Sequence, residues 1–378
     1  MSDRIQVMQP WLGDAEVEAV AAVIRSGWVA QGPQVAEFEN SFARRVETTS
    51  AVAVSSCTTG LHLVLHALGV VPGDEVVVPS LSFIATANAV RYVGAAPIFA
   101  DVDLETQNLT LETIDRVVTP RTRAVLAVHQ VGMPLDLDSI RAYCEDRGVT
   151  LIEDAACAIG STYRGRPIGA SPSIGVFSFH PRKLLTTGEG GMVVSSDEDF
   201  SARLRRLRAH GMSVSALDRH DSSRVSFEEY GELGFNFRMT DMQAAMGLVQ
   251  LSRLDAMVER RRALAAMYHE ALDGVPGLVL PVDPPHGTTN FQSYAIRMTE
   301  DCPIPRDDMM QRFLDEGIST RRGVMASHRE PAYQGFDHAP LPNTELLADQ
   351  AIILPLHHAM TAADIERVAS TMRLEARV

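Results

Sequence analysis

The chain has 378 residues, of which 46% are hydrophobic and 22% are charged, as is typical of a globular protein long enough for two domains. Its formal net charge of -14 argues against nucleic acid or an anionic membrane as a partner, because both bind clustered lysine and arginine. The four cysteines form no CxxC pair, no apolar run approaches the roughly 20 residues of a membrane span, and the first residues lack a signal-peptide pattern. We therefore expect a soluble, cytoplasmic protein without a disulfide framework.

Strand-like and helix-like segments alternate over the first half of the chain. The strand-like runs are short and apolar on both sides, which is typical of a parallel sheet covered by helices on both faces. In chain order they lie at residues 51–56, 75–80, 96–102, 124–130, 150–156, 173–179 and 190–196.

A long helical pattern follows and leads to a second region. Apolar residues recur at helical spacing from Thr240 to about Leu272, with no glycine after Gly247 and with Thr240 as a plausible N-cap. Beyond it, strand-like runs at 292–299 and 351–356 alternate with helical ones at 305–317 and 361–375. We predict an α/β protein with a large domain (1–255) built on a mainly parallel, doubly wound sheet and a smaller C-terminal α/β domain (256–378).

Candidate binding residues stand at the ends of the predicted strands, where open parallel sheets bind their ligands. Ser55–Gly60 opens a helix whose free N–H groups could hold a phosphate, although serine and threonine also simply cap helices. Asp154 ends an apolar strand, where a carboxylate needs a cation or hydrogen-bond donors. Lys183 lies in a polar turn between two apolar runs; it is either a surface or ion-paired lysine or an amine with a chemical role.

One cofactor uses all three features. Pyridoxal 5'-phosphate (PLP) needs a helix N-terminus and hydroxyl groups for its phosphate, an acid against its ring nitrogen, and a lysine for a Schiff base. The sequence lacks the GxGxxG, GxxxxGK[ST] and GxSxG motifs, which leaves dinucleotide, nucleotide-triphosphate and serine-hydrolase chemistry without an anchor. His357 and His358 have no partners at ligand spacing, so we expect no metal site.

Five segments in fixed order resemble the DegT/DnrJ/EryC1/StrS family of PLP-dependent sugar aminotransferases, which have the aspartate aminotransferase fold (fold type I). They are SSCTTGLHLVLHAL, GDEVVVPSLSFIATANAV, IEDAACAIG, FSFHPRKLLTTGEGG and GFNFRMTDMQAA, and the resemblance spans nearly the whole chain. It implies that Lys183 forms the internal aldimine with PLP and that Asp154 pairs with the pyridine nitrogen. It also implies phosphate contacts from Thr58, Thr59 and Ser178, and Phe83 stacked on the cofactor ring.

The resemblance further implies a homodimer with shared active sites. GFNFRMTD resembles the segment that the family lends across the interface to the neighbouring phosphate, and Asn236 and Arg238 are its polar side chains. Cys157 stands where the family usually has glutamine or histidine near the cofactor's hydroxyl, and a thiol is a poorer hydrogen-bond partner. A branch that dehydrates sugars has histidine in place of Lys183, so the lysine favours transamination.

The implied reaction transfers an amino group from L-glutamate, through pyridoxamine phosphate, to a nucleotide-linked 3- or 4-keto-6-deoxy sugar. The product would be an amino sugar for a glycoconjugate or a secondary metabolite. Candidate contacts to the sugar or its diphosphate, each of which could equally be a surface or interface residue, are His180, Arg321, Arg322, His328 and Tyr333. Two alternatives stay open: the same chemistry on a cyclitol or other free ketone with L-glutamine as donor, and a non-catalytic relative with a regulatory or structural role.

Overall fold

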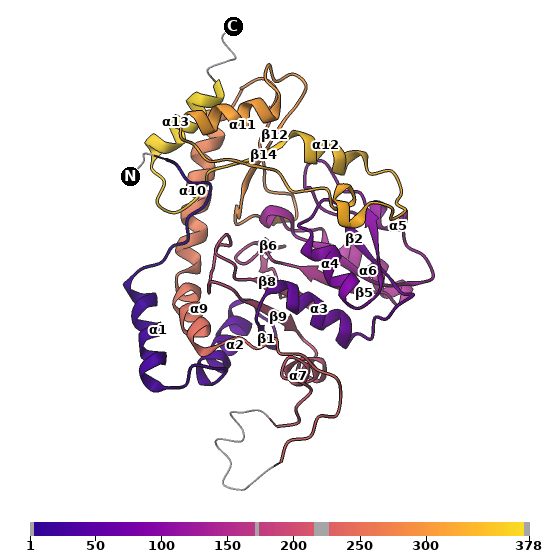
Figure 1. Ribbon diagram of the computed structural model, residues 1–378. Coiled ribbons are helices and arrows are strands. Elements are labelled where there is room, and N and C mark those ends of the chain that lie inside the picture. Colours follow the sequence, from indigo (N-terminus) through magenta and orange to yellow (C-terminus); the bar gives the residue numbers. More distant parts are fainter. Residues whose placement is uncertain (1–3, 171–173, 215–226, 374–378) are drawn as a thin grey trace.

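A seven-stranded sheet forms the centre of the fold, with the spatial order β1-β9-β8-β5-β4-β2-β3 (Figure 1). The computed structural model describes residues 4–170, 174–214 and 227–373. All strands of the sheet run parallel except β9, which is antiparallel to both of its neighbours, β1 and β8. This confirms the predicted mainly parallel sheet. The strands are β1 (Ser50–Val54), β2 (Glu75–Pro79), β3 (Ala96–Ala100), β4 (Thr122–Val128), β5 (Thr150–Asp154), β8 (Ile174–Ser178) and β9 (Gly191–Ser195).

Helices cover both faces of this sheet, as its two-sided apolar strands require. One face carries a core that includes Leu61 and Val90, and the other a core that includes Phe38 and Phe42. The first face is covered by α3 (Cys57–Ala67), α4 (Ala85–Tyr92) and α7 (Glu198–Leu207), and the second by α2 (Pro33–Arg45), α5 (Leu111–Asp115), α6 (Leu137–Arg147) and α9 (Asp241–Ser252). Helix α3 packs so closely at Gly60 that a Cβ there would lie 2.8 Å from Cγ1 of Val176.

The region from Thr240 to Leu272 forms two helices, α9 and α10 (Leu254–Leu272), where we expected one. Thr240 caps α9 as predicted, because its hydroxyl accepts from the backbone N–H of Gln243 at 3.3 Å. The break is at Arg253, whose φ of -104° and ψ of 5° depart from helical values. It lets α9 pack against α1 (Asp14–Ser26) and α2 while α10 packs against α13 (Ala362–Arg373).

A second, antiparallel sheet of order β10-β12-β14-β13 forms the C-terminal part (Figure 1). Its core includes Tyr268, Tyr294, Phe313 and Ile352. The strands are β10 (Leu278–Val279), β12 (Tyr294–Met298), β13 (Arg321–Arg322) and β14 (Ala351–Leu354), and the further helices are α11 (Arg306–Asp315) and α12 (Pro342–Gln350). The domain boundary that we placed between residues 255 and 256 lies in the first turn of α10 and stays a prediction.

A small third sheet connects the two parts. Strand β11 (Gly287–Thr288) pairs with β6 (Thr162–Tyr163), which pairs with β7 (Arg166–Pro167). In this way the chain that leaves α10 returns to the loops after β5 before it enters β12.

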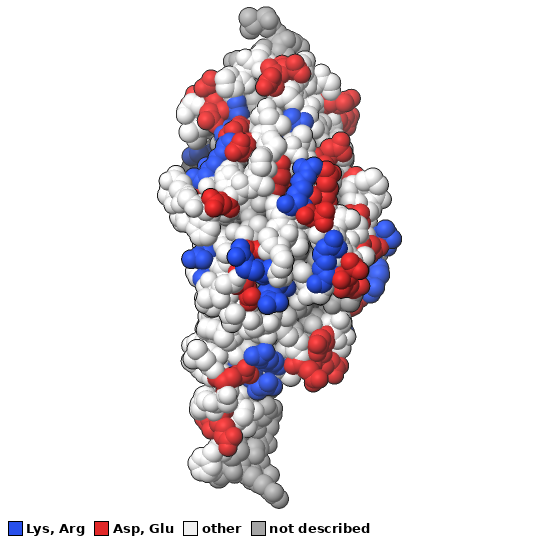
Figure 2. Space-filling view, turned by 90° about the vertical axis from the view of Figure 1, so that its right-hand side faces the viewer, with Lys and Arg blue, Asp and Glu red and all other residues white. Residues whose placement is uncertain are grey.

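Charge is mixed on the surface that Figure 2 shows: acidic and basic side chains are interspersed over this face, and neither sign forms a continuous patch. Within the described residues, no helix is long and apolar enough to cross a membrane.

Candidate active site

The start of α3 lies directly beside β9, at the end of the sheet where β5 and β8 also finish. A Cβ at Gly191, the first residue of β9, would lie 2.7 Å from both the N of Cys57 and the C of Ser56. Only glycine allows this approach, which leaves the first turn of α3 next to the ends of the central strands. Residues far apart in the sequence therefore meet at this edge.

The hydroxyl groups at the start of α3 are partly used by the helix itself. Ser56 is the N-cap and accepts from the backbone N–H of Thr59 at 3.1 Å, while Thr59 Oγ1 accepts from the N–H of Ser56 at 3.0 Å. The cap interpretation therefore holds for Thr59. Thr58 is half-buried on the same turn, and Ser178, at the end of β8, is 8% exposed.

The segment around Asn236 and Arg238 also lies at the start of α3. The backbone N–H of Ser55 donates to the carbonyl oxygen of Phe237 at 2.8 Å within the same chain. Asn236 is exposed and Arg238 is half-buried. Both residues are thus next to the first turn of α3.

Asp154 is a buried carboxylate held by hydrogen-bond donors. It is 5% exposed; Oδ2 accepts from Thr86 Oγ1 at 3.0 Å, and Oδ1 accepts from the N–H of Ala156 at 3.1 Å and faces Cys57 Sγ at 3.9 Å. Burial raises the pKa of Asp154, against the opposing effects of the Ala156 N–H, Lys183 and Thr86. No cation contacts the carboxylate in the described part of the chain, so it can accept an N–H from a cationic ring. Nothing in the sequence distinguishes Thr86 and Cys57 as partners of Asp154, although both lie in segments that resemble the family.

Lys183 reaches toward the loop after β5. It is partly buried in the turn after β8, and its Nζ donates to Cys157 Sγ at 3.0 Å. Burial lowers the pKa of this amine, but Cys157, Cys57 and Asp154 raise it and together outweigh burial. Lys183 is also the only lysine in the sequence, so no other side-chain amine is present for a Schiff base.

Phe83 lies in the same turn as Thr86, whose backbone N–H donates to its carbonyl oxygen at 3.1 Å. It is 68% exposed in the loop after β2, although it is a large apolar side chain. Neighbouring Ser82 donates its N–H to the carbonyl oxygen of Met325 at 3.1 Å, so a C-terminal segment supports the loop. An exposed ring on a fixed loop is suited to stacking on a flat ligand.

Comparison with known proteins decides the family. The profile of the DegT/DnrJ/EryC1/StrS aminotransferase family matches residues 10–373. The chain belongs to this family. It is a sugar aminotransferase, and its cofactor is PLP.

Solved structures of similar proteins agree. The aminotransferase TlmJ from Streptoalloteichus hindustanus shares 39% identity, with 98% of each chain covered and a TM-score of 0.90. DesI, solved in the presence of its TDP-sugar product, shares 35% identity, with 99% of this chain and 93% of that one covered and a TM-score of 0.90. The PLP form of Spr1654 from Streptococcus pneumoniae, a candidate sugar aminotransferase, shares 25% identity, with 98% of each chain covered and a TM-score of 0.90.

The residues of this sugar aminotransferase fit PLP. Asp154 is a buried carboxylate with donors but no contacting cation among the described residues, Lys183 is the only lysine, and Phe83 offers an exposed ring. The first turn of α3 presents backbone N–H groups, and because Gly191 has no side chain, β9 can lie directly beside this turn.

Positive charge gathers near the lysine of this sugar aminotransferase. Burial lowers the pKa of Arg321, and the charges of Arg182 and Arg322 lower it further. Within the described residues neither Arg182 nor Arg321 contacts a carboxylate, whereas Arg322 pairs with Glu330 at 3.5 Å. His180 lies beside them: burial lowers its pKa, as do Arg182, Lys183 and Arg321, while Glu189 opposes the change.

Two of the candidate sugar contacts are engaged inside the protein. His328 is 8% exposed, with Nδ1 at 2.7 Å from Ser80 Oγ and Nε2 at 3.3 Å from Glu345. Tyr333 is 3% exposed, and its hydroxyl donates to Asn88 Oδ1 at 2.8 Å. We leave both residues out of the proposed substrate site.

Proposed function

We propose that this sugar aminotransferase transfers the amino group of L-glutamate to the keto group of a nucleotide-linked 3- or 4-keto-6-deoxy sugar, with Lys183 and Asp154 as its catalytic residues. The observation that carries the proposal is that the only lysine in the sequence, in the turn after β8, lies close enough to the buried carboxylate of Asp154, at the end of the neighbouring strand β5, for each charge to affect the pKa of the other. With PLP bound, a lysine amine near a buried carboxylate suits proton transfer at a carbon next to an amino group.

Bound PLP would supply an aldehyde for the lysine amine and a ring that withdraws electrons. Asp154 accepts the N–H of the ring nitrogen, while Thr86 and the Ala156 N–H keep the carboxylate in place. Lys183 Nζ would be the base that takes the proton from the α-carbon of the amino donor, and in the second half-reaction it would give a proton to the former keto carbon of the acceptor sugar. Thr58, Ser178 and the backbone N–H groups at the start of α3 would hold the phosphate, Thr59 would fix that turn through its capping bonds, and Phe83 would stack on the ring. Cys157, which accepts from Lys183 Nζ, would lie near the ring hydroxyl.

Both substrates are anions, and the unpaired arginines suit them. A carboxylate or a diphosphate accepts paired hydrogen bonds from a guanidinium. Arg182 and Arg321, with His180 and Arg322 beside them, form the proposed site for these groups. The TDP-sugar product in the DesI structure supports a nucleotide diphosphate as the larger of the two.

The active form is proposed to be a cytoplasmic homodimer. The segment that precedes Asn236 and Arg238 exposes three large apolar side chains, Phe227 at 86%, Tyr230 at 60% and Leu233 at 79%. A second copy would cover them, because large apolar groups clustered on a surface mark interaction sites. The backbone at Phe237 lies beside α3 of its own chain, and from there the side chain of Asn236 or Arg238 is proposed to reach across the interface to the phosphate of the partner subunit.

The test is the absorption spectrum of the purified protein with PLP, followed by addition of L-glutamate or L-glutamine. Borohydride reduction and peptide mass analysis should locate the bound cofactor on Lys183. Bleaching of the visible band by L-glutamate, and its recovery with a TDP-linked keto-sugar, are expected. Bleaching by L-glutamine alone, with recovery on a cyclitol ketone, would replace the proposal with that alternative. Cofactor bound elsewhere than Lys183 would overturn it.

A further inference from the structure

The connection between β11 and β12 is unusually buried for a segment without regular structure. Thr289, Asn290, Phe291 and Gln292 are 3%, 0%, 7% and 6% exposed. Phe291 has a φ of 48°, in the left-handed region that residues other than glycine rarely adopt. Asn290 Oδ1 accepts from the N–H of Gln292 at 2.7 Å and closes an Asx turn around Phe291. Such a conformation persists only where its surroundings hold it.

Asn290 holds the loop that carries Cys157. Its Nδ2 donates to the carbonyl oxygens of Cys157 at 2.9 Å and Ile159 at 2.8 Å, and its backbone N–H donates to Ser161 Oγ at 3.0 Å. The side chain also lies against Gly132, where a Cβ would be 2.0 Å from Asn290 Oδ1. The loop after β5 is therefore fixed to this connection.

Gln292 holds the turn that carries Lys183. Its Nε2 donates to the carbonyl oxygen of Arg182 at 2.6 Å, one residue before the lysine. Its Oε1 is buried and has no hydrogen-bond partner in the described part of the chain, which is unfavourable. If Gln292 served stability alone, a hydrogen bond to Oε1 as well as one from Nε2 would be favourable. We therefore assign the role of this residue to the bond from Nε2 to Arg182.

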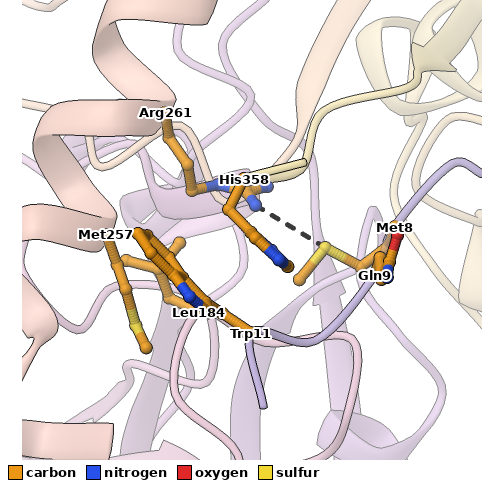
Figure 3. Close-up of a pocket in the computed structure, with 7 residues that line it drawn as sticks. All are labelled: Met8, Gln9, Trp11, Leu184, Met257, Arg261 and His358. Carbon is orange, nitrogen blue, oxygen red and sulfur yellow. Dashed lines mark hydrogen bonds between the residues drawn. The ribbon is translucent and has the colours of Figure 1, made fainter. Parts of the chain in front are cut away.

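Arg261 fixes the backbone of the same connection from α10. It is 5% exposed; Nε donates to the carbonyl oxygen of Phe291 at 2.8 Å and Nη2 to that of Gln292 at 2.6 Å. Figure 3 shows its third contact, from Nη1 to Met8 Sδ at 3.5 Å. Burial lowers the pKa of Arg261 to about 9, so it is still charged at neutral pH. No carboxylate contacts it within the described residues, and Nε and Nη2 donate to the carbonyl groups on either side of Gln292.

We propose that Gln292 is a positioning residue for the reactive amine. Anchored by Arg261 and the Asx turn, it holds the Lys183 turn at a fixed place relative to the Cys157 loop, so that Nζ stays 3.0 Å from Cys157 Sγ. The connection between β11 and β12, which leads into the C-terminal sheet, thereby determines the position of Lys183 Nζ. This inference rests on the proposed role of Lys183.

Gln292→Met tests it, because methionine keeps the length of the side chain and removes the donor. Gln292→Asn is measured in parallel. It keeps the amide, but its side chain is one methylene too short to reach the carbonyl oxygen of Arg182. Asn343→Leu is the matched control, since Asn343 Nδ2 donates to the carbonyl oxygen of Val102 at 2.8 Å, in the loop after β3. Three properties are compared: the acetylation rate of Lys183 in the cofactor-free protein, the pH midpoint of the visible band with PLP bound, and kcat against KM.

We expect both Gln292 variants to change the acetylation rate of Lys183 and to lower kcat by about fivefold, the equivalent of one typical hydrogen bond. KM for the donor should stay within about twofold, the pH midpoint should shift, and the control should show none of these changes. Wild-type acetylation and an unmoved pH midpoint in the Gln292 variants would overturn the inference, even if stability falls. Failure of borohydride to attach PLP to Lys183 in the wild type would instead overturn the proposed role of the lysine.

Discussion

Thr86→Val should move the acid limb of the pH–rate profile to higher pH. Thr86 Oγ1 donates to Asp154 Oδ2 at 3.0 Å, and this bond lowers the pKa of a carboxyl group that burial raises. A hydrogen bond to a charged group contributes about 1.5–3 kcal/mol, and about 1.4 kcal/mol corresponds to one pKa unit. Loss of the bond should therefore raise the pKa of Asp154 by about one to two units.

The sign follows from the charge that the reaction needs. Asp154 acts as a carboxylate, so activity is present above its pKa and is lost as the pH falls through it. A higher pKa brings that loss to a higher pH, which the rate of the L-glutamate half-reaction, followed by stopped-flow absorbance, would show.

Thr344→Val is the matched control for this change. Thr344 is fully buried and donates to Asp101 Oδ1 at 2.8 Å, outside the proposed site. The free energy of unfolding should fall by a similar amount in Thr344→Val and Thr86→Val, but the acid limb of the pH–rate profile should not shift in Thr344→Val. An acid limb at the wild-type pH in folded Thr86→Val would refute the reasoning.

Three further changes test other parts of the site. Lys183→Arg keeps the charge but cannot give up its proton, so turnover should fall by at least about 10²–10⁴-fold and borohydride should attach no PLP; substantial turnover would contradict the assignment. Gly191→Ala puts a Cβ 2.7 Å from the N of Cys57 and should weaken PLP binding, measured by fluorescence quenching, and lower the free energy of unfolding by about 1–3 kcal/mol. Gly13→Ala, where a Cβ would have only Glu16 Oε2 within 4 Å, at 4.0 Å, is its control, and equal losses in the two would count against the role of Gly191. Arg321→Gln should raise KM for the nucleotide sugar about tenfold, and Arg322→Gln should raise it less because Arg322 pairs with Glu330; the reverse order would exclude Arg321 as the main contact.

The strands and the positions of Lys183 and Asp154 could be predicted because their signals are local. Short runs that are apolar on both sides occur where a strand is buried on both faces, and a charged residue at the end of such a run is visible in the sequence itself. The same is true of the Thr240 cap, which depends on residues three positions apart.

The remaining features depend on partners that are distant in the chain. Nothing near Thr86 shows that its hydroxyl meets a carboxylate 68 residues later, and nothing near Gln292 shows that it meets a carbonyl 110 residues earlier. The break at Arg253 has no glycine or proline to mark it; it depends on packing against α1, α2 and α13. His328 and Tyr333 look like surface residues in a polar stretch, yet both are buried with internal partners.

A chain with one lysine is a natural selectively labelled sample. Supplying lysine enriched in ¹⁵N at the side chain would place a single ε-nitrogen in the whole polypeptide, at Lys183, and its chemical shift would distinguish an ammonium from an imine in solution. An endoproteinase specific for lysine has one cleavage site, in the turn after β8, and cutting there would yield two fragments. Because PLP that borohydride has fixed to the amine makes this side chain too bulky for such a protease, the uncut fraction would report how much of the protein carried its cofactor.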